Sequence, residues 1–208
     1  RWGSESTGGN AEFALILFAG LVAFNLFADV VSAAPNLILS HTNFVKRVVF
    51  PIEILPVTQT IVAMVQSFWQ VGILLVGAWL FLGTFSKTLF LLPFAYVPLV
   101  LLSLGIGWFL ASLGVFVRDT DHFVRIAVQM LFFLTPVFYP LEIVPAFFQS
   151  ILKLNPLTYI LTLFRQVVLF GEMPAFSSYL LALVTTYLIA WLGYSWFMKT
   201  KTSFADVL

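Results

Sequence analysis

The sequence has few charged residues and no cysteine. Asp, Glu, Lys and Arg together make up 9% of the 208 residues, against about 25% in soluble domains. Without cysteine, the chain can form neither disulfides nor thiolate metal sites. A formal net charge of +1 provides no basic surface, so we expect no nucleic-acid partner.

Apolar residues fill most of the chain. Hydrophobic residues account for 61% of the sequence, and the mean hydropathy is +1.04. A bilayer core of roughly 30 Å needs about 20 apolar residues per helical span, and several runs reach that length. No repeated ten-residue alternation of polar and apolar positions is present, which favours helices as the spanning elements. The sequence therefore predicts an all-α integral membrane protein that forms one transmembrane domain over residues 1–208.

Five runs are long enough to cross a bilayer as helices. They cover about 13–34, 57–82, 89–117, 123–139 and 179–198. The residues at 35–56 contain prolines and charges, which is typical of a membrane-surface segment with a short amphipathic helix. The turn GTFSK, 83–87, joins the second and third spans. We thus predict five complete transmembrane helices in this chain.

Between the fourth and fifth spans lie two apolar stretches that are too short to cross. They cover 145–156 and 157–171 and meet at Asn155-Pro156. About 14 helical residues extend only roughly 21 Å. Pro145 at one helix start and Gly171 at one helix end are the expected boundaries. We interpret residues 140–176 as a re-entrant helical hairpin before the last span.

Cationic residues are distributed unevenly between the two expected membrane sides. The positive-inside rule places the polar C-terminal tail in the cytoplasm. The cytoplasmic cations are then Lys46, Arg47, Arg118, Arg125, Lys199 and Lys201, and the others are Arg1, Lys87, Lys153 and Arg165. Residues 1–10 would be external. Because the first methionine is Met64, we expect a C-terminal piece of a longer protein with at least one span upstream.

Few residues could support catalysis at membrane depth. Only Asp29 lies clearly within a predicted span, where an ionisable group costs about 2.5–3.5 kcal/mol on insertion scales. With Asn25 one turn away, we interpret it as an interhelical hydrogen-bonding or boundary residue. His41 and His122 lack a metal-ligand spacing. We therefore predict no catalytic residue and no metal site.

The string GTFSKT, 83–88, does not form a phosphate-binding loop. It lacks the second glycine of that motif and a preceding buried strand. If the protein uses ATP, the ATPase must be another chain.

Polar and aromatic residues of the spans are candidates for a passage wall. Gln59, Gln66 and Gln70 recur on one helical face, where their amides could bond sugar hydroxyls or, equally, neighbouring helices. Aromatic rings could line the same path, although most face lipid or the interface. The candidate aromatic residues are Trp69, Trp108, Phe132, Phe133 and Tyr139. Ser103, Gly107 and Ala111 form a small-residue stripe that permits close helix approach.

Charged residues concentrate in VFVRDTDHFVRI, 115–126, between two apolar segments. A short turn between two spans must be soluble in water, and that alone accounts for some of its charge. The alternative is a contact with a partner protein. Charge by itself does not decide between these two interpretations.

Three stretches together resemble the membrane-spanning subunit of type-2 ABC exporters. They are NFVKRVVFPIEILP (43–56), GVFVRDTDHFVRIAVQMLFFLTPVFYPLEIVP (114–145) and LNPLTYILTLFRQVVLFGE (154–172). The resemblance is to the polysaccharide and polyol-phosphate branch, which moves O-antigen, capsule or teichoic acid. Members of this family usually have six spans preceded by an amphipathic interface helix. That helix and the first span would be missing from this sequence.

The resemblance implies a function. It implies a homodimeric permease that exports a lipid-linked polysaccharide across the bacterial inner (cytoplasmic) membrane as a multi-pass protein surrounded by lipid. A separate ABC ATPase subunit would hold ATP and Mg, so this chain itself would carry no cofactor. The alternatives are a type-2 permease for a drug or small lipid, and a membrane enzyme acting on lipid-linked glycans. External loops with few convergent ionisable residues argue against the enzyme.

The resemblance also implies site residues. Those expected to contact the ATPase are Lys46, Arg47, Pro51, Glu53, Arg118, Asp119 and Asp121. Those expected at an extracytoplasmic gate, in the hairpin, are Pro145, Asn155, Pro156 and Arg165.

Overall fold

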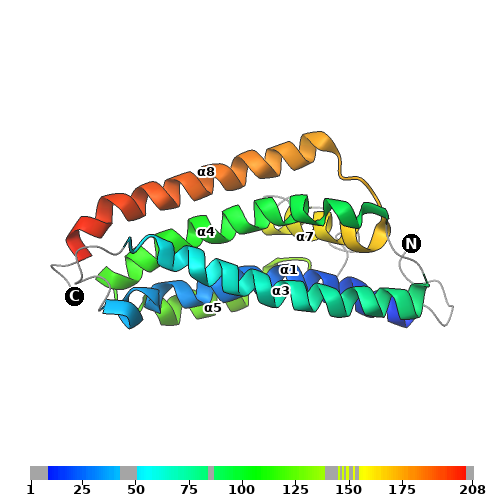
Figure 1. The fold of residues 1–208 in the computed structure, drawn as a ribbon, viewed down its shortest axis with the longest axis horizontal. Coiled ribbons are helices and arrows are strands. Elements are labelled where there is room, and N and C mark those ends of the chain that lie inside the picture. Colours follow the sequence, from blue (N-terminus) through cyan, green and yellow to red (C-terminus); the bar gives the residue numbers. More distant parts are fainter. Residues whose placement is uncertain are drawn as a thin grey trace.

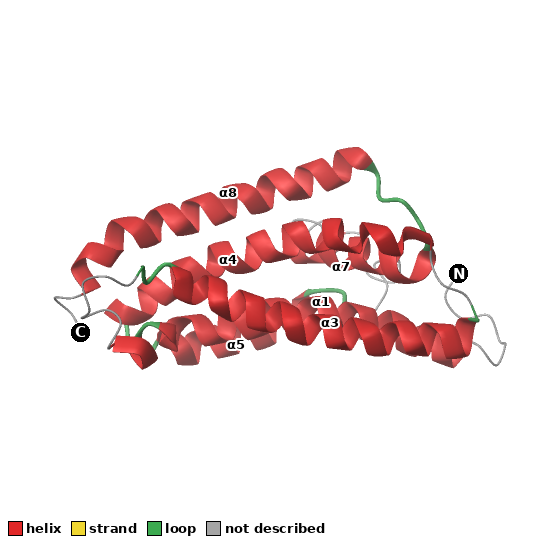
Figure 2. Cartoon of the chain, in the orientation of Figure 1, coloured by secondary structure: helices red, strands yellow, loops and turns green. Residues whose placement is uncertain are grey.

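The computed structural model describes residues 9–42, 51–83, 87–138, 145, 147, 149, 152 and 155–204. Within these ranges the regular structure is helical, as Figure 2 shows. The α-helices are α1 (Gly9–Leu37), α3 (Ile54–Leu82), α4 (Leu92–Phe116), α5 (Thr120–Leu134), α7 (Pro156–Arg165) and α8 (Phe176–Thr200). Short turns η1 (Leu39–His41), η2 (Lys87–Leu91), η4 (Gln166–Phe170) and η5 (Lys201–Ser203) join them. The predicted all-α class is confirmed for this part of the chain.

The helices form an elongated bundle around α1 (Figure 1). Helix α1 packs against α3, α4, α5 and α7, whereas α8 packs mainly on α4. Apolar residues of α1 such as Val22, Ala23 and Leu26 are almost completely buried. Many large apolar residues on α3 and α8 are instead exposed. Apolar surface of this kind on long helices is what a lipid environment requires.

In the part of the chain that the structure describes, four helices are long and apolar enough to cross a membrane. They cover Ala11–Leu37, Ile54–Phe81, Thr88–Phe116 and Phe176–Ser203, which matches four of the predicted spans. The predicted fourth span, 123–139, corresponds to α5, a helix of 15 residues. At 1.5 Å per residue such a helix extends roughly 22 Å, less than a bilayer core. The structure therefore does not confirm five complete spans.

Small residues allow backbone contact between helices. Gly105 of α4 lies against Gly193 of α8 so closely that a Cβ on Gly193 would overlap the Gly105 carbonyl oxygen. A Cβ on Gly114 would likewise overlap the Pro35 carbonyl oxygen of α1. The predicted stripe of Ser103, Gly107 and Ala111 is buried, and it lies on α4, which contacts both α1 and α8. Small residues are the usual means of close helix packing in membranes.

The predicted hairpin is described mainly in its second half. Helix α7 and the π-helical turn η4 cover Pro156–Phe170, an apolar helix too short to span. Asn155 caps the start of α7, because its side chain accepts a hydrogen bond from the Leu157 amide at 3.0 Å. Gly171 ends the helix with φ of 68°, a conformation that suits glycine. The predicted helix end at Gly171 is thus confirmed, and α7 begins at the predicted junction Asn155-Pro156. The predicted helix start at Pro145 stays a prediction, because most of 139–154 lies outside the described residues.

Candidate functional site

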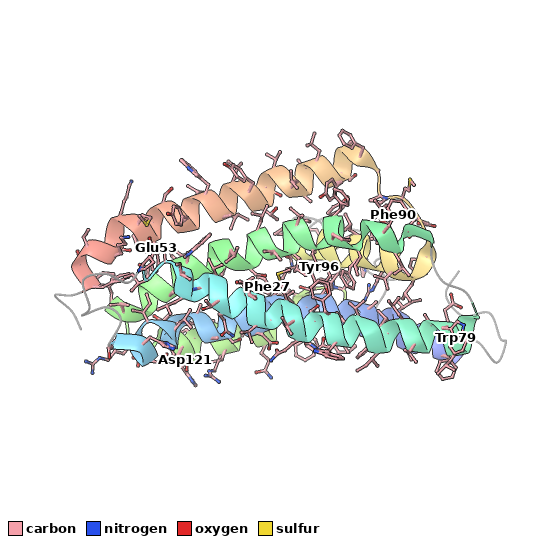
Figure 3. All side chains as sticks on the ribbon, viewed as in Figure 1. Phe27, Glu53, Trp79, Phe90, Tyr96 and Asp121 are labelled. Carbon is pink, nitrogen blue, oxygen red and sulfur yellow. The ribbon has the colours of Figure 1, made fainter. Side chains whose placement is uncertain are left out.

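Among the described residues, one end of the bundle carries a group of ionisable side chains. We call it the charged end and define it by Glu53, Arg118, Asp119, Asp121 and Lys201. Figure 3 shows Glu53 and Asp121 at this end and Trp79 and Phe90 at the opposite end. Four helix ends meet here: the start of α3, the end of α4, the start of α5 and the end of α8.

Glu53 fixes the start of α3 to the neighbouring helices. Its carboxylate accepts a hydrogen bond from Lys201 Nζ at 3.2 Å, and its carbonyl oxygen accepts one from Trp108 Nε1 at 3.0 Å. Beside this contact, the hydroxyls of Ser112 and Thr200 are 2.7 Å apart. Glu53 therefore makes internal contacts that join α3, α4 and α8. Of the other residues predicted to contact an ATPase in this segment, Pro51 is exposed, and Lys46 and Arg47 lie outside the described residues.

The turn between α4 and α5 exposes two unpaired charges. Arg118 and Asp119 are exposed, and neither has an ion-pair partner in the part of the chain that the structure describes. Asp119 occupies the N-cap position of α5, but its side chain makes no capping bond. The turn is held instead by Thr120, whose hydroxyl donates to the Val117 carbonyl oxygen at 2.6 Å. Asp121 differs, because it pairs with Arg125 at 3.1 Å.

A polar groove lies beside the charged end, between α1, α3 and α5. Its volume is about 350 Å³. The lining residues are Asp29, Ser32 and Ala33 of α1, Gln59 and Gln66 of α3, and Arg125 of α5. A carboxylate, two amides, a hydroxyl and a guanidinium together offer both donors and acceptors to a hydroxylated ligand. Facing lipid, these groups would carry a large desolvation cost, so the groove suits water or another polar surface.

The groove contains only part of the predicted passage wall. Gln59 and Gln66 line it, but Gln70 does not, and the Gln70 Oε1 atom is buried without a hydrogen-bond partner in the described structure. Trp69 is 75% exposed on the outer side of α3. Trp108 is half-buried, bonds the Glu53 carbonyl and packs edge-on against Tyr194. The structure therefore places Trp108 in a helix contact.

The aromatic residues predicted to line a passage in the fourth span also differ in their surroundings. Phe132 packs against Phe24 of α1, with ring centroids 5.0 Å apart, and against Phe138 at 4.8 Å. Phe133 is 65% exposed. Tyr139 lies outside the described residues. The passage roles of these residues remain predictions.

Three of the four predicted gate residues, Asn155, Pro156 and Arg165, belong to α7 or its N-cap. Pro145 is exposed, and its carbonyl oxygen accepts the Gln149 amide at 3.1 Å, as in a helical turn. Asn155 also donates to Thr135 Oγ1 at 3.1 Å, which ties the start of α7 to the end of α5. Pro156 begins α7. Arg165, by contrast, is only 7% exposed and lies inside the bundle.

Three of the polar groove residues were not assigned to a passage from the sequence. Asp29 and Arg125 are far apart in the sequence, and Ser32 is an unremarkable polar residue of the first span. A usable signal does exist: Asp29 and Ser32 lie three residues apart on one face of α1, and Gln59 and Gln66, seven residues apart, share a face of α3. Which helix faces meet depends on how the helices pack, and the sequence of one span does not specify its neighbours.

The fold and the site define a class: a multi-pass helical membrane protein with a charged end and a polar groove between spans. The sequence matches the family described as "ABC-2 type transporter" over residues 1–169. The chain belongs to this family of transporters, in agreement with the prediction of a permease in place of an enzyme.

Several characterised transporters are similar to the chain over much of its length. It is 23% identical over 200 residues to the O-antigen export system permease protein RfbA of Klebsiella pneumoniae, covering 95% of this chain and 76% of that protein. The RfbA protein of Myxococcus xanthus is 23% identical over 202 residues, which cover 94% and 76% of the two chains. The polysialic acid transport protein KpsM of Escherichia coli is 25% identical over 162 residues, 77% of this chain and 62% of KpsM.

Proposed function

We propose that this chain is the permease subunit of an ATP-driven exporter that moves a lipid-linked polysaccharide across the bacterial inner membrane. The observation that carries the proposal is similarity over 95% of the chain to permeases named for O-antigen export. The polar groove between α1, α3 and α5 adds a physical reason, because its amide and carboxylate groups match sugar hydroxyls. A separate ABC ATPase would supply the energy, and ATP with Mg would bind there.

The intact exporter contains two copies of the permease in this proposal. In the described part of the chain, α3 and α4 pack on α1 and α8 packs mainly on α4. A bundle of so few helices is too small to enclose a passage for a polymer within one copy. Two copies with their polar groove faces toward each other could enclose one. The face that carries Asp29, Gln66 and Arg125 is exposed in the single chain and would be enclosed or hydrated in the pair.

The finer topology is also part of the proposal. The charged end is cytoplasmic, because Arg118, Arg125, Lys199 and Lys201 gather there. Helix α5 and the residues after it form a further, broken crossing. Residues 140–176 dip into the outer leaflet as a re-entrant hairpin, whose second half is α7 and η4.

Removing the chain from its host cell tests the function. We expect loss of a surface polysaccharide and accumulation of its lipid-linked precursor inside the cell, measured by glycan extraction and surface labelling. Re-expression of the chain should restore export. Normal surface polysaccharide with impaired efflux of a drug or small lipid would favour the alternative permease. Absence of the lipid-linked polymer itself would indicate an enzyme that builds it.

Cysteine labelling tests the groove and its orientation, because the chain has no native cysteine. Ser32→Cys and Gln66→Cys should react with a charged, membrane-impermeant thiol reagent applied from the cytoplasmic side. Val65→Cys is the matched control, since Val65 is 52% exposed next to Gln66 but does not line the groove. Equal, slow reaction of all three variants would mean that the groove holds no water. Faster reaction from the external side would reverse the proposed topology.

A further inference from the structure

Arg165 is a buried cation held by carbonyl oxygens. Its Nε donates to the Ile16 carbonyl at 3.1 Å, Nη1 donates to Pro136 at 3.0 Å, and Nη2 donates to Val137 at 2.7 Å. In the described part of the chain, none of its partners is a carboxylate. One planar guanidinium thus joins three segments: α7, α1 and the residues that follow α5. Its five donors in a fixed fork suit three separate acceptors, which a lysine ammonium cannot reach in the same geometry.

The carbonyl groups at the end of α5 need such a donor. Helix α5 ends at Leu134, and Pro136 and Val137 are buried outside any helix. Within a membrane, non-helical backbone is tolerated only where protein or water satisfies its polar groups. Arg165 satisfies the carbonyls of both residues. The break that shortens α5 therefore depends on a side chain from α7.

Gly20 makes room for the guanidinium on α1. A Cβ on Gly20 would overlap Arg165 Nη2 and would lie 3.2 Å from Cζ. The Ile16 carbonyl is one helical turn before Gly20, so the missing side chain leaves that oxygen open to Arg165. The sequence accordingly contains a matched pair: a large cation on α7 and a glycine on α1.

Helix α7 is attached to the end of α5 at two points. Asn155 reaches Thr135 Oγ1 from the start of α7, and Arg165 reaches Pro136 and Val137 from its end. The other end of α5 begins directly after the exposed charges of Arg118 and Asp119. Helix α5 thus connects the charged end to α7 through a short, continuous set of contacts.

We propose that Arg165 is a positioning residue that couples the end of α5 to α7, so that movement of α5 at the charged end moves α7. This inference rests on the proposed function, in which an ATPase acts at the charged end and α7 belongs to the exit. The contact is suited to repeated movement, because neutral carbonyl acceptors bind a cation less tightly than a carboxylate does. The residue acts through α7 and touches no substrate.

The test measures nucleotide-dependent movement at the end of η4. Glu172→Cys, an exposed position next to Gly171, receives an environment-sensitive fluorophore in the complex purified with its ATPase. The signal is compared with and without MgATP in four backgrounds: Arg165→Lys, Arg165→Gln, Gly20→Ala and Gly72→Ala. Gly72 is the matched control, because a Cβ there meets nothing within 4 Å. Folded yield and ATP hydrolysis are measured for each variant.

We expect the MgATP-dependent signal to remain in Gly72→Ala. In Gly20→Ala and Arg165→Gln it should fall at least about fivefold, the lower range of ordinary coupling between sites, with ATP hydrolysis retained. Arg165→Lys should resemble Arg165→Gln, because charge alone does not bridge three carbonyls. The double variant Gly20→Ala/Arg165→Gln should be no worse than either single variant, since both remove the same contact.

The outcomes separate this inference from the proposed function. An unchanged signal in Gly20→Ala and Arg165→Gln, with normal yield, would overturn the coupling role. If Gly20→Ala and Arg165→Gln both fail to fold, Arg165→Lys decides the question. A folded Arg165→Lys variant that keeps the full MgATP-dependent signal would also overturn the coupling role. A parent complex that exports no glycan and shows no MgATP-dependent signal would instead contradict the proposed function.

Discussion

Gly193→Ala should lower the free energy of unfolding by about 1–3 kcal/mol, the usual cost of forcing extra atoms into a packed interior. The added Cβ would overlap the Gly105 carbonyl oxygen and lie 2.7 Å from the Gly105 carbonyl carbon. These atoms belong to the backbone of α4, so no side-chain rotation can relieve the overlap. Helices α4 and α8 must separate, and α8 has its main packing surface on α4. Gly193→Leu should abolish the accumulation of folded protein.

The measurement is thermal unfolding of the detergent-extracted protein, monitored by size-exclusion fluorescence. Gly72→Ala is the control within α3, where the new methyl group meets nothing within 4 Å. It should be neutral or stabilising by up to about 1 kcal/mol, because alanine is the better helix former. If Gly193→Ala were as stable as Gly72→Ala, the close contact between α4 and α8 would be wrong.

Hydropathy and length were sufficient to predict four of the spans. Runs such as 57–82 and 89–117 are strongly apolar on average and contain no charged residue, so each run is informative without knowledge of its neighbours. The boundaries at Asn155 and Gly171 were also predictable, because an Asn-Pro pair and a glycine act locally on the backbone. Local signals therefore gave most of the element order.

The length of α5 could not be predicted from such signals. Apolar residues continue past Leu134, so the sequence favours one long span over 123–139. The helix ends early because Thr135-Pro136 interrupts it and because Arg165, 29 residues beyond Pro136, supplies donors for the buried carbonyls that are left outside the helix. That compensation is a tertiary contact, and hydropathy contains no information about it.

The candidate site, like the fold, could be predicted where local signals exist and not where it depends on contacts between distant residues. The charges at 118–125 stand out in an apolar chain. Arg118 and Asp119 lie in the exposed turn, whereas Asp121 and Arg125 lie at the start of α5. The face of Gln59 and Gln66 was also apparent from spacing. The internal pairing of Glu53 with Lys201, 148 residues apart, was not. Contacts across that distance depend on how α3 and α8 meet at the charged end.

Arg118→Ala and Asp119→Ala should abolish ATPase binding and glycan export while leaving the folded permease intact. Both side chains are exposed and unpaired among the described residues, and the turn is held by Thr120 and backbone bonds instead. Removing them therefore takes away no internal contact. A charge-assisted hydrogen bond at a protein interface is worth about 1.5–3 kcal/mol. Loss of two such bonds, about 3–6 kcal/mol, would weaken binding of a partner by about two to four orders of magnitude, at about 1.4 kcal/mol per tenfold.

A purely structural role for Asp119 predicts the opposite pattern. A capping carboxylate would contribute about 0.5–2 kcal/mol to stability, and its loss would lower folded yield while the remaining complex stayed active. The structure argues against this, because Asp119 stands at the N-cap of α5 without a capping bond. Only the weaker attraction to the helix dipole remains, about 0.3–1 kcal/mol at an exposed site. The stability change on Asp119→Ala should therefore be small.

The experiment quantifies folded permease, co-purified ATPase and surface glycan for each variant. Glu12→Ala is the matched control, because Glu12 is an exposed carboxylate in the first turn of a helix, as Asp119 is beside α5, but at the opposite end of the bundle. It should retain both binding and export. Charge reversal in Asp119→Arg should be more damaging than Asp119→Ala if a cationic partner faces this position, since like charges at an interface repel. Full ATPase binding by all three variants, Arg118→Ala, Asp119→Ala and Asp119→Arg, would contradict the prediction. The turn would then be only a solvated connection between α4 and α5, and the ATPase would have to contact the permease elsewhere.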